Sequence, residues 1–183
     1  MTTKSKSIIP QATEVITNKE QLNLPLTHIN SGKVRETFIV PKRGSYAFLI
    51  VTTDRWSAFD FKMPQGIPLK GRILNSMSNL TFSLTSDIVP NHIITTDMSS
   101  AFEGSDKFLD KLSGRSVLVK RAEPILFECI VRGFLYGTAF AEYTAKDSGG
   151  KVCGIQLKPG LVKASKIATP IFTPSTKRIT VHD

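Results

Sequence analysis

VRETFIVPKRGSYAFLIVTT, residues 34–53, is the stretch that decides the fold. Residues 34–40 and 46–53 are rich in β-branched and aromatic side chains, which favour strands. PKRGS between them is typical of a turn because glycine, proline and serine each suit turn geometry. The sequence therefore predicts an antiparallel hairpin at the centre of the first part of the chain.

A helix is predicted downstream of this hairpin, over residues 71–86. Its apolar residues recur at helical spacing, so we expect an amphipathic helix whose methionine and leucine side chains belong to the core. These residues are Ile73, Leu74, Met77, Leu80 and Leu84. Residues 92–95 and 116–120 are predicted strands, and residues 99–112 a loop and short helix.

ILFECIVRGF, residues 125–134, is predicted to be a single strand with one buried face, because its odd positions 125–131 are all apolar. The other face carries Glu128 and Arg132, about 13 Å apart at the rise of a strand. They lie too far apart to bind each other, so each needs its own partner. Charged residues on neighbouring strands are one possibility, and a ligand is the other.

A turn containing Gly133 and Gly137 follows this strand and leads into the helical stretch AFAEYTAKD, with Thr138 in its first turn. Backbone N–H groups, a hydroxyl and the Arg132 guanidinium would converge there, which favours a phosphate site. The alternative is that Thr138 is an ordinary helix N-cap without a ligand.

SGKVRE, residues 31–36, is a second candidate phosphate site. Gly32 permits close approach of the backbone to a ligand, and Lys33 and Arg35 are expected to project from one face of the incoming strand. A solvated basic strand edge is the alternative. In TTDRWSAFD, residues 52–60, acids follow a buried strand, a pattern that by itself indicates only a cap or a turn.

The composition favours one globular, lobed unit with an anionic partner. Of 183 residues, 40% are hydrophobic and 21% charged, and the formal net charge is +9. The lysines and arginines are dispersed and are not interleaved with aromatic residues, so small phosphorylated or carboxylated substrates explain the charge better than nucleic acid does. The longest apolar stretch, residues 46–51, is too short to span a membrane.

The two cysteines, Cys129 and Cys153, cannot form a disulfide framework or a four-ligand zinc site at their spacing. We expect both to be structural thiols in a reducing compartment, which the cytoplasm provides. Glu14 and Glu20 and the lack of an apolar run argue against a secretory signal in the first 27 residues, while a transit peptide stays open.

Six segments together resemble the phosphoribosylaminoimidazole-succinocarboxamide synthase (SAICAR synthetase) family, in order and in spacing from Gly32 to Asp183. They are SGKVRE, VTTDRWSAFD, GRILNSMS, LFECIVRGFLYGTAFAEY, CGIQLKPGL and PIFTPSTK followed by HD. Glu36 stands where the family usually has Asp, Trp56 where it has a smaller aliphatic residue, and Thr138 where Ser is common.

The resemblance implies an α+β fold related to ATP-grasp and kinase-like nucleotide clefts, with an antiparallel sheet lobe and an incomplete second mixed lobe. Residues 1–27 would be a polar lead, 28–118 the N-terminal lobe with the ATP-phosphate hairpin, and 119–183 the beginning of the second lobe with the ribotide site. Because the family continues beyond the His182–Asp183 pair, the resemblance implies a fragment or the product of a truncated reading frame.

The implied activity is a step of de novo purine biosynthesis that uses ATP and Mg²⁺. L-aspartate would be joined to the carboxylate of carboxyaminoimidazole ribotide through an acyl phosphate, giving SAICAR, ADP and phosphate. The implied partners are these small molecules, with no nucleic acid and no membrane, and the oligomeric state stays open. The alternatives are a non-catalytic fragment that binds nucleotide or ribotide, and a basic nucleic-acid-binding module.

The resemblance also implies roles for individual residues. The loop over the ATP phosphates would consist of Gly32, Lys33 and Arg35, and the hinge at the adenine of Lys120, Arg121 and Ala122. The ribotide phosphate would be held by Arg132, Gly137 and Thr138. The reacting carboxylate would lie near Glu128 and Asp183, which are the candidate magnesium ligands, with Lys177, Ser175 and Thr176 in the same cleft. The resemblance does not fix the places of Asp54 and Asp60.

Overall fold

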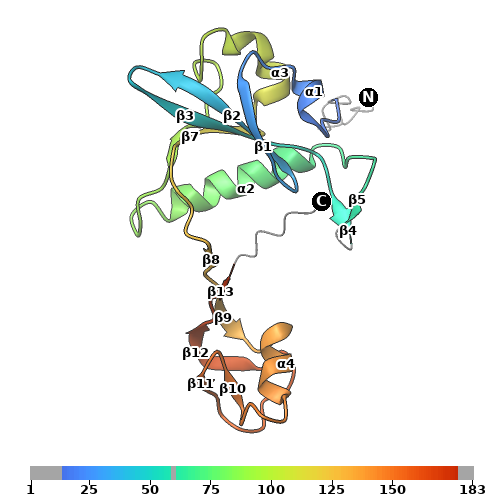
Figure 1. Ribbon diagram of the computed structural model, residues 1–183, viewed down its shortest axis with the longest axis vertical. Helices are drawn as coiled ribbons and strands as arrows, with labels where there is room; N and C mark the ends of the chain where they lie inside the picture. Colours follow the sequence, from blue (N-terminus) through green and yellow to red (C-terminus); the bar gives the residue numbers. More distant parts are fainter. Residues whose placement is uncertain (1–13, 59–60, 177–183) are drawn as a thin grey trace, which may run out of the picture. The chain divides into compact units, whose positions relative to one another are not determined.

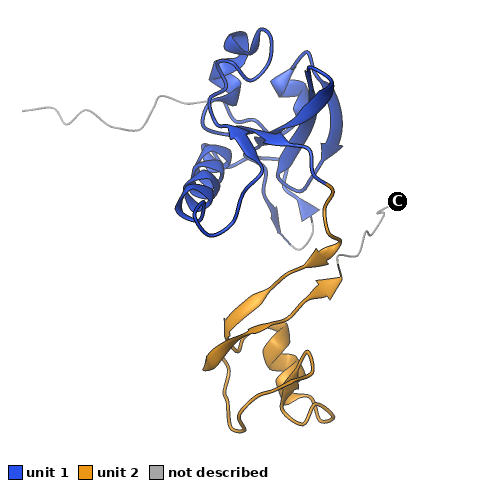
Figure 2. Cartoon of the chain, turned by 90° about the vertical axis from the view of Figure 1, so that its left-hand side faces the viewer, with its two compact units in different colours: residues 1–122 blue, residues 123–183 orange. Residues whose placement is uncertain are grey.

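The computed structural model describes residues 14–58 and 61–176. The chain divides into two compact units, residues 1–122 and residues 123–183 (Figure 2). Each unit has its own hydrophobic core.

Unit 1 is built on a five-stranded antiparallel sheet in the order β1-β2-β3-β7-β6 (Figure 1). The strands are β1 (Thr27–Ser31), β2 (Arg35–Lys42), β3 (Ser45–Thr52), β6 (Ile93–Thr95) and β7 (Ser116–Lys120). The predicted hairpin is confirmed, since β2 and β3 pair from Arg35↔Thr52 to Lys42↔Ser45. Two further short strands, β4 (Ser57–Ala58) and β5 (Phe61–Lys62), pair with each other.

One face of this sheet packs on the main core of unit 1. Alternate residues of β2 and β3 are buried on it, because successive side chains of a strand point to opposite faces. Phe38, Val40, Leu49 and Val51 are the large apolar ones. The short helices α1 (Lys19–Leu22), η1 (Ser105–Phe108) and α3 (Leu109–Leu112) contribute side chains to the same cluster.

The helix α2 (Lys70–Leu84) lies across the sheet (Figure 1), but the prediction that its leucine and methionine side chains are core is wrong. Met77 and Leu80 are about 60% exposed, and the buried residues of the helix are Gly71 and Asn75. A Cβ at Gly71 would lie 2.3 Å from the Thr52 carbonyl oxygen, so this turn of the helix lies directly against the backbone of β3.

Polar anchors explain this orientation of α2. The Gly71 N–H donates to Asp54 Oδ1 at 2.8 Å, and Asn75 Nδ2 donates to the carbonyls of Gly114 and Ser116. Buried donors and acceptors must be paired, so these bonds fix which side of the helix faces the sheet. The apolar stripe is thereby left on the exposed side.

Over its described residues, 123–176, unit 2 consists of three two-stranded antiparallel pairs and one helix. The pairs are β8 (Phe127–Glu128) with β13 (Ser175–Thr176), β9 (Val131–Phe134) with β12 (Lys166–Phe172), and β10 (Lys151–Val152) with β11 (Ile155–Gln156). The helix is α4 (Thr138–Thr144). The core of unit 2 comprises Leu135, Ala139, Val152, Leu157, Ile167 and Ile171.

The prediction of one strand with a buried odd face over residues 125–134 is wrong. The segment forms two short strands with a break at Cys129 and Ile130, and Ile125, Phe127 and Val131 are exposed. The physical reason is that β8 pairs only with the two-residue β13, and the core of unit 2 is formed by other residues, beginning at Leu135.

Both cysteines are exposed, so the prediction that they are structural thiols is also wrong. Cys129 lies in the break between β8 and β9, and Cys153 lies at the turn of the β10–β11 hairpin with a φ of 46°. Neither position has a core to pack into.

The expected α+β class, with antiparallel sheets and few helices, is confirmed. Over residues 14–58 and 61–176 no helix has the length and apolar character needed to cross a membrane.

Candidate functional site

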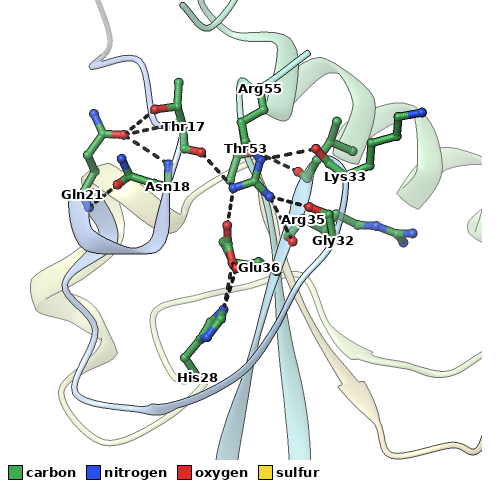
Figure 3. Close-up of polar contacts among 12 residues, drawn as sticks. Thr17, Asn18, Gln21, His28, Gly32, Lys33, Arg35, Glu36, Thr53 and Arg55 are labelled. Atoms are coloured by element: carbon green, nitrogen blue, oxygen red, sulfur yellow. Dashed lines mark hydrogen bonds and ion pairs between the residues drawn. The ribbon is translucent and has the colours of Figure 1, made fainter. Parts of the chain in front are cut away.

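The segment 31–36 forms the connection between β1 and β2 and lies in unit 1 (Figure 3). Within this segment residues 32–35 form a tight bend, in which the Gly32 N–H donates to the Arg35 carbonyl at 2.8 Å. Lys33 lies in the bend and Arg35 begins the strand, so the expectation that both project from one strand face is wrong. Both side chains are exposed, as a site for a solvent-borne anion requires.

Glu36 follows this bend and points into the core face, where its side chain is only 1% exposed. Its carboxylate accepts hydrogen bonds from Ser31 Oγ at 2.6 Å and from Arg55, and it contacts His28 Nε2 at 2.8 Å (Figure 3). Burial raises the pKa of the Glu36 carboxyl. The hydrogen bonds of Ser31, Arg55 and His28 and the charge of Arg55 lower this pKa by more than burial raises it, so the net shift is downward.

The free energy of unfolding of unit 1 is expected to fall in acid because of Glu36. Its folded pKa lies below the ordinary value of 4.5, so this contribution is complete above about pH 4.5 and is lost as the pH falls through the folded pKa. Urea unfolding at pH 7 and pH 4, followed by the fluorescence of Trp56, the single tryptophan, measures the effect.

In Glu36→Gln the loss of stability between pH 7 and pH 4 is expected to be smaller than in the unsubstituted chain. The matched control is Glu103→Gln, which changes an exposed glutamate of the same unit. An acid dependence that is unchanged in Glu36→Gln would contradict the assignment.

Asp54 and Arg115 form a second buried polar cluster in unit 1. Arg115 Nη1 donates to Asp54 Oδ2 at 2.9 Å, and the side chains are 1% and 0% exposed. The carboxylate also accepts from the N–H groups of Ile16 and Gly71. Asp54 therefore joins the segment before α1, the first turns of α2 and the turn that precedes β7, which is a structural role.

The hinge residues proposed from the sequence lie at the end of β7. Lys120 ends the strand, and the Arg121 guanidinium lies over the Tyr46 ring at 5.0 Å from its centroid. Both line a hollow of about 490 Å³ with Lys42 and Ile94, and Ala122 ends unit 1.

The structure does not bring this hinge and the segment 31–36 together. β3 pairs with Lys120 at Ala47 and with Arg35 at Thr52. The positions of β3 that pair with Lys120 and with Arg35 are therefore five residues apart, which is about 17 Å along the strand. A single nucleotide would have to lie extended along the sheet to reach both.

Arg35 also lines a separate hollow of about 320 Å³ between α2 and the sheet, together with Asn75 and Phe82.

Arg132 is the centre of the candidate site in unit 2. Its Nε donates to Thr173 Oγ1 at 3.0 Å, its Nη2 to Thr138 Oγ1 at 3.2 Å, and its Nη1 contacts the Tyr136 carbonyl at 3.5 Å. The partners of Arg132 within the described residues are hydroxyl and carbonyl oxygens, so its positive charge is not neutralised by a carboxylate there.

The structure brings four of the predicted residues to one hollow of about 430 Å³ in unit 2. These are Glu128, Arg132, Thr138 and Ser175. Glu128 and Ser175 face each other in the β8–β13 pair. Thr138 is the first residue of α4, Gly137 precedes it with a φ of 60°, and the helix has no side-chain cap bond, so the interpretation of Thr138 as an N-cap is wrong.

Of the remaining predicted residues, Thr176 does not line this hollow and the others lie outside the described residues. Thr176 pairs with Phe127 and is exposed. Lys177, Asp183 and Asp60 lie outside the described residues. In the part of the chain that the structure describes, no group of three or more His, Cys, Asp or Glu side chains could hold a metal ion.

Sequence reasoning missed Arg55 and His28, which hold Glu36. A signal for them exists in the sequence. Glu36 has the same parity as Phe38 and Val40 in its strand, so an inward-facing carboxylate was predictable, and a buried carboxylate requires a cationic partner.

These two units define an α+β protein with antiparallel sheets, in which exposed or half-buried arginines lie beside hollows. Residues 28–183 match the family model described as SAICAR synthetase. The chain belongs to the SAICAR synthetase family.

Individual relatives agree with this assignment. The chain is 46% identical over 156 residues to the phosphoribosylaminoimidazole-succinocarboxamide synthase of Syntrophotalea carbinolica. The matched region covers 85% of this chain and 50% of the relative. The chain is 44% identical to that of Trichlorobacter lovleyi, with coverage of 90% and 54%. The solved SAICAR synthase of Saccharomyces cerevisiae complexed with SAICAR is 32% identical, with a TM-score of 0.73 and coverage of 91% and 54%. The chain thus spans about half the length of the relatives it matches.

Proposed function

We propose that this chain contributes to an enzyme that joins L-aspartate to carboxyaminoimidazole ribotide at the expense of ATP, giving SAICAR, ADP and phosphate in purine biosynthesis. Membership of the family supports this, as does the yeast relative, which was solved with SAICAR. The observation that carries the proposal is the hollow in unit 2, where Glu128, Arg132, Thr138 and Ser175 meet.

The ribotide's phosphate would bind at Arg132 and Thr138, next to Gly137. An arginine presents a planar fork of donors that matches phosphate oxygens, and the Thr173 and Thr138 hydroxyls already hold this fork in one orientation. Fixing the phosphate would place the rest of the ribotide along the hollow toward Glu128 and Ser175, with Thr176 and Lys177 following Ser175 in the chain.

The chemistry requires activation because a carboxylate is a poor electrophile. An oxygen of the ribotide carboxylate would attack the γ-phosphorus of ATP, which releases ADP and leaves an acyl phosphate. The aspartate amine would then attack the acyl carbon, and phosphate leaves as the amine loses a proton. Positioning and neutralisation of charge supply most of the acceleration in phosphoryl transfer, which suits a chain of net charge +9.

ATP would lie along unit 1, with its phosphates at Gly32, Lys33 and Arg35 and its base at Lys120, Arg121 and Ala122. Mg²⁺ favours carboxylate oxygens combined with phosphate oxygens, and Glu128 supplies one such carboxylate at the hollow. Glu128 would be one ligand of the ion, and Asp183 is the proposed second ligand. The bound ion would neutralise phosphate charge. The partners we propose are small molecules, and the proposed location is the cytoplasm.

Isothermal titration calorimetry of the chain with carboxyaminoimidazole ribotide and with ATP–Mg²⁺ tests the proposal, together with an assay for SAICAR formation. We expect both ligands to bind. Binding of both without product formation would favour the non-catalytic alternative. Random-sequence RNA that binds with a steep salt dependence, while neither small ligand binds, would contradict the whole proposal.

A further inference from the structure

Arg55 uses its whole hydrogen-bonding capacity on the protein itself (Figure 3). A guanidinium has five N–H donors, and five acceptors are present. The acceptors are the carbonyls of Thr17, Gly32, Lys33 and Arg35 and the carboxylate of Glu36. Arg55 is buried, so no donor is left for a ligand.

Four consecutive carbonyls of the bend, from Gly32 to Arg35, accept hydrogen bonds from the segment that follows β3. Arg55 binds those of Gly32, Lys33 and Arg35. The Val34 carbonyl accepts from the Thr53 N–H at 2.8 Å and from its hydroxyl at 2.9 Å. Every peptide plane of the bend is therefore held from the same side.

This arrangement determines where the N–H groups of the bend point. In a trans peptide the C=O of one residue and the N–H of the next point in opposite directions, and the peptide bonds of this segment are trans. Carbonyls turned toward Thr53 and Arg55 therefore turn the N–H groups of Lys33, Val34 and Arg35 away from them. Backbone N–H groups that point outward from a bend favour an anion on that side.

The guanidinium is itself fixed in place. Glu36 accepts from it, and Glu36 is held by Ser31 and contacts His28. A buried charged group costs desolvation free energy that a simple turn between two strands would avoid. The network therefore selects one conformation of the bend, and stabilising a hairpin alone would not require it.

We propose that Arg55 is a positioning residue that holds the bend 32–35 in the conformation that binds the polyphosphate of a nucleotide. This inference rests on the proposed function, since that function places the ATP phosphates at this bend. Arg55 acts through the carbonyls of the bend and does not touch the ligand. Preorganised donors bind an anion more tightly because no reorganisation accompanies binding.

The test uses the full chain with Arg55→Lys, Arg55→Met and Thr53→Val. Lysine keeps the charge but has three donors where arginine has five, and Thr53→Val removes only the hydroxyl bond to Val34. The matched control is Leu112→Ala, which destabilises the core of the same unit away from the bend. Amide hydrogen exchange is measured without ligand at Gly32 and Thr53, whose N–H groups donate to carbonyls of the bend, together with the thermal midpoint and the Kd for a fluorescent ATP analogue.

We expect faster exchange at the bend and a Kd weakened roughly tenfold in both Arg55 variants, which corresponds to about one hydrogen bond to a charged group. Thr53→Val should change both in the same direction by less, and Leu112→Ala should change neither. Exchange at the bend that is equal to that of the unsubstituted chain, or a Kd no weaker than that of Leu112→Ala, would overturn the inference. If the unsubstituted chain does not bind the analogue, the placement of ATP fails, and hydrogen exchange still decides whether Arg55 holds the bend.

Discussion

Replacing Asp54 with alanine is expected to lower the free energy of unfolding of unit 1 by about 3–5 kcal/mol, the usual cost of removing one partner of a buried ion pair. The side chain is 0% exposed. It accepts from Arg115 Nη1 at 2.9 Å, from the Ile16 N–H at 3.0 Å and from the Gly71 N–H at 2.8 Å. Its loss leaves a buried guanidinium and two backbone donors without their acceptor.

A double-mutant cycle separates the pair from its surroundings. Arg115→Met alone leaves the Asp54 carboxylate buried and uncompensated, whereas the double variant removes both charges. We therefore expect the double variant to lose less stability than the sum of the two single variants. Urea unfolding followed by Trp56 fluorescence reports on unit 1. A cost below about 1 kcal/mol for Asp54→Ala would contradict the role given to this carboxylate.

The hairpin was predictable because its two strands carry a local pattern that tertiary context does not oppose. β-branched and aromatic residues over residues 34–40 and 46–53 indicated strands, and PKRGS indicated the turn. The observed strands differ by two residues or fewer at each end. The same pattern indicates that Glu36 faces the core, since it has the parity of Phe38 and Val40 in its strand.

The orientation of α2 could not be read from its apolar spacing. Five apolar residues indicated one buried stripe, yet the helix turns Gly71 and Asn75 toward the sheet, where their polar partners lie. These partners are Asp54 and the carbonyls of residues 114 and 116, all far from the helix residues in sequence. Such bonds are tertiary interactions that a local pattern does not contain. The odd face of residues 125–131 was wrong for a related reason, because a strand with apolar residues is buried only where a second layer covers it.

The two candidate sites differ in how much of them a sequence can reveal. Arg132 and Thr138 are six residues apart, so the strand, turn and helix between them suggested that they would meet. Their side chains are 3.2 Å apart in the structure. Arg55 contacts carbonyls about 20 residues earlier in the chain. Every residue has a backbone carbonyl, so the sequence does not indicate which carbonyls accept from Arg55, and only the structure could show this cluster.

Replacing Arg132 with alanine is expected to weaken the binding of carboxyaminoimidazole ribotide about a hundredfold. Two hydrogen bonds from a guanidinium to a phosphate, at about 1.5 kcal/mol each, amount to about 3 kcal/mol. Thr173 and Thr138 hold the guanidinium at the edge of the hollow, so little side-chain entropy is lost when a phosphate binds. Titration calorimetry of the full chain with the ribotide measures the change.

The control for this experiment is Arg43→Ala, which removes the same charge from an exposed turn of unit 1. Both variants lose the same one unit of net charge and so weaken long-range attraction, whereas a direct contact is lost only in Arg132→Ala. The affinity of Arg132→Ala should therefore lie far below that of Arg43→Ala, and the gap should persist at high salt. Thr138→Val should weaken binding less, because it removes a hydroxyl and leaves the charge. If Arg132→Ala binds the ribotide within threefold of Arg43→Ala, the phosphate does not lie at this turn, and Glu128 loses the geometric reason for its proposed place beside the reacting carboxylate.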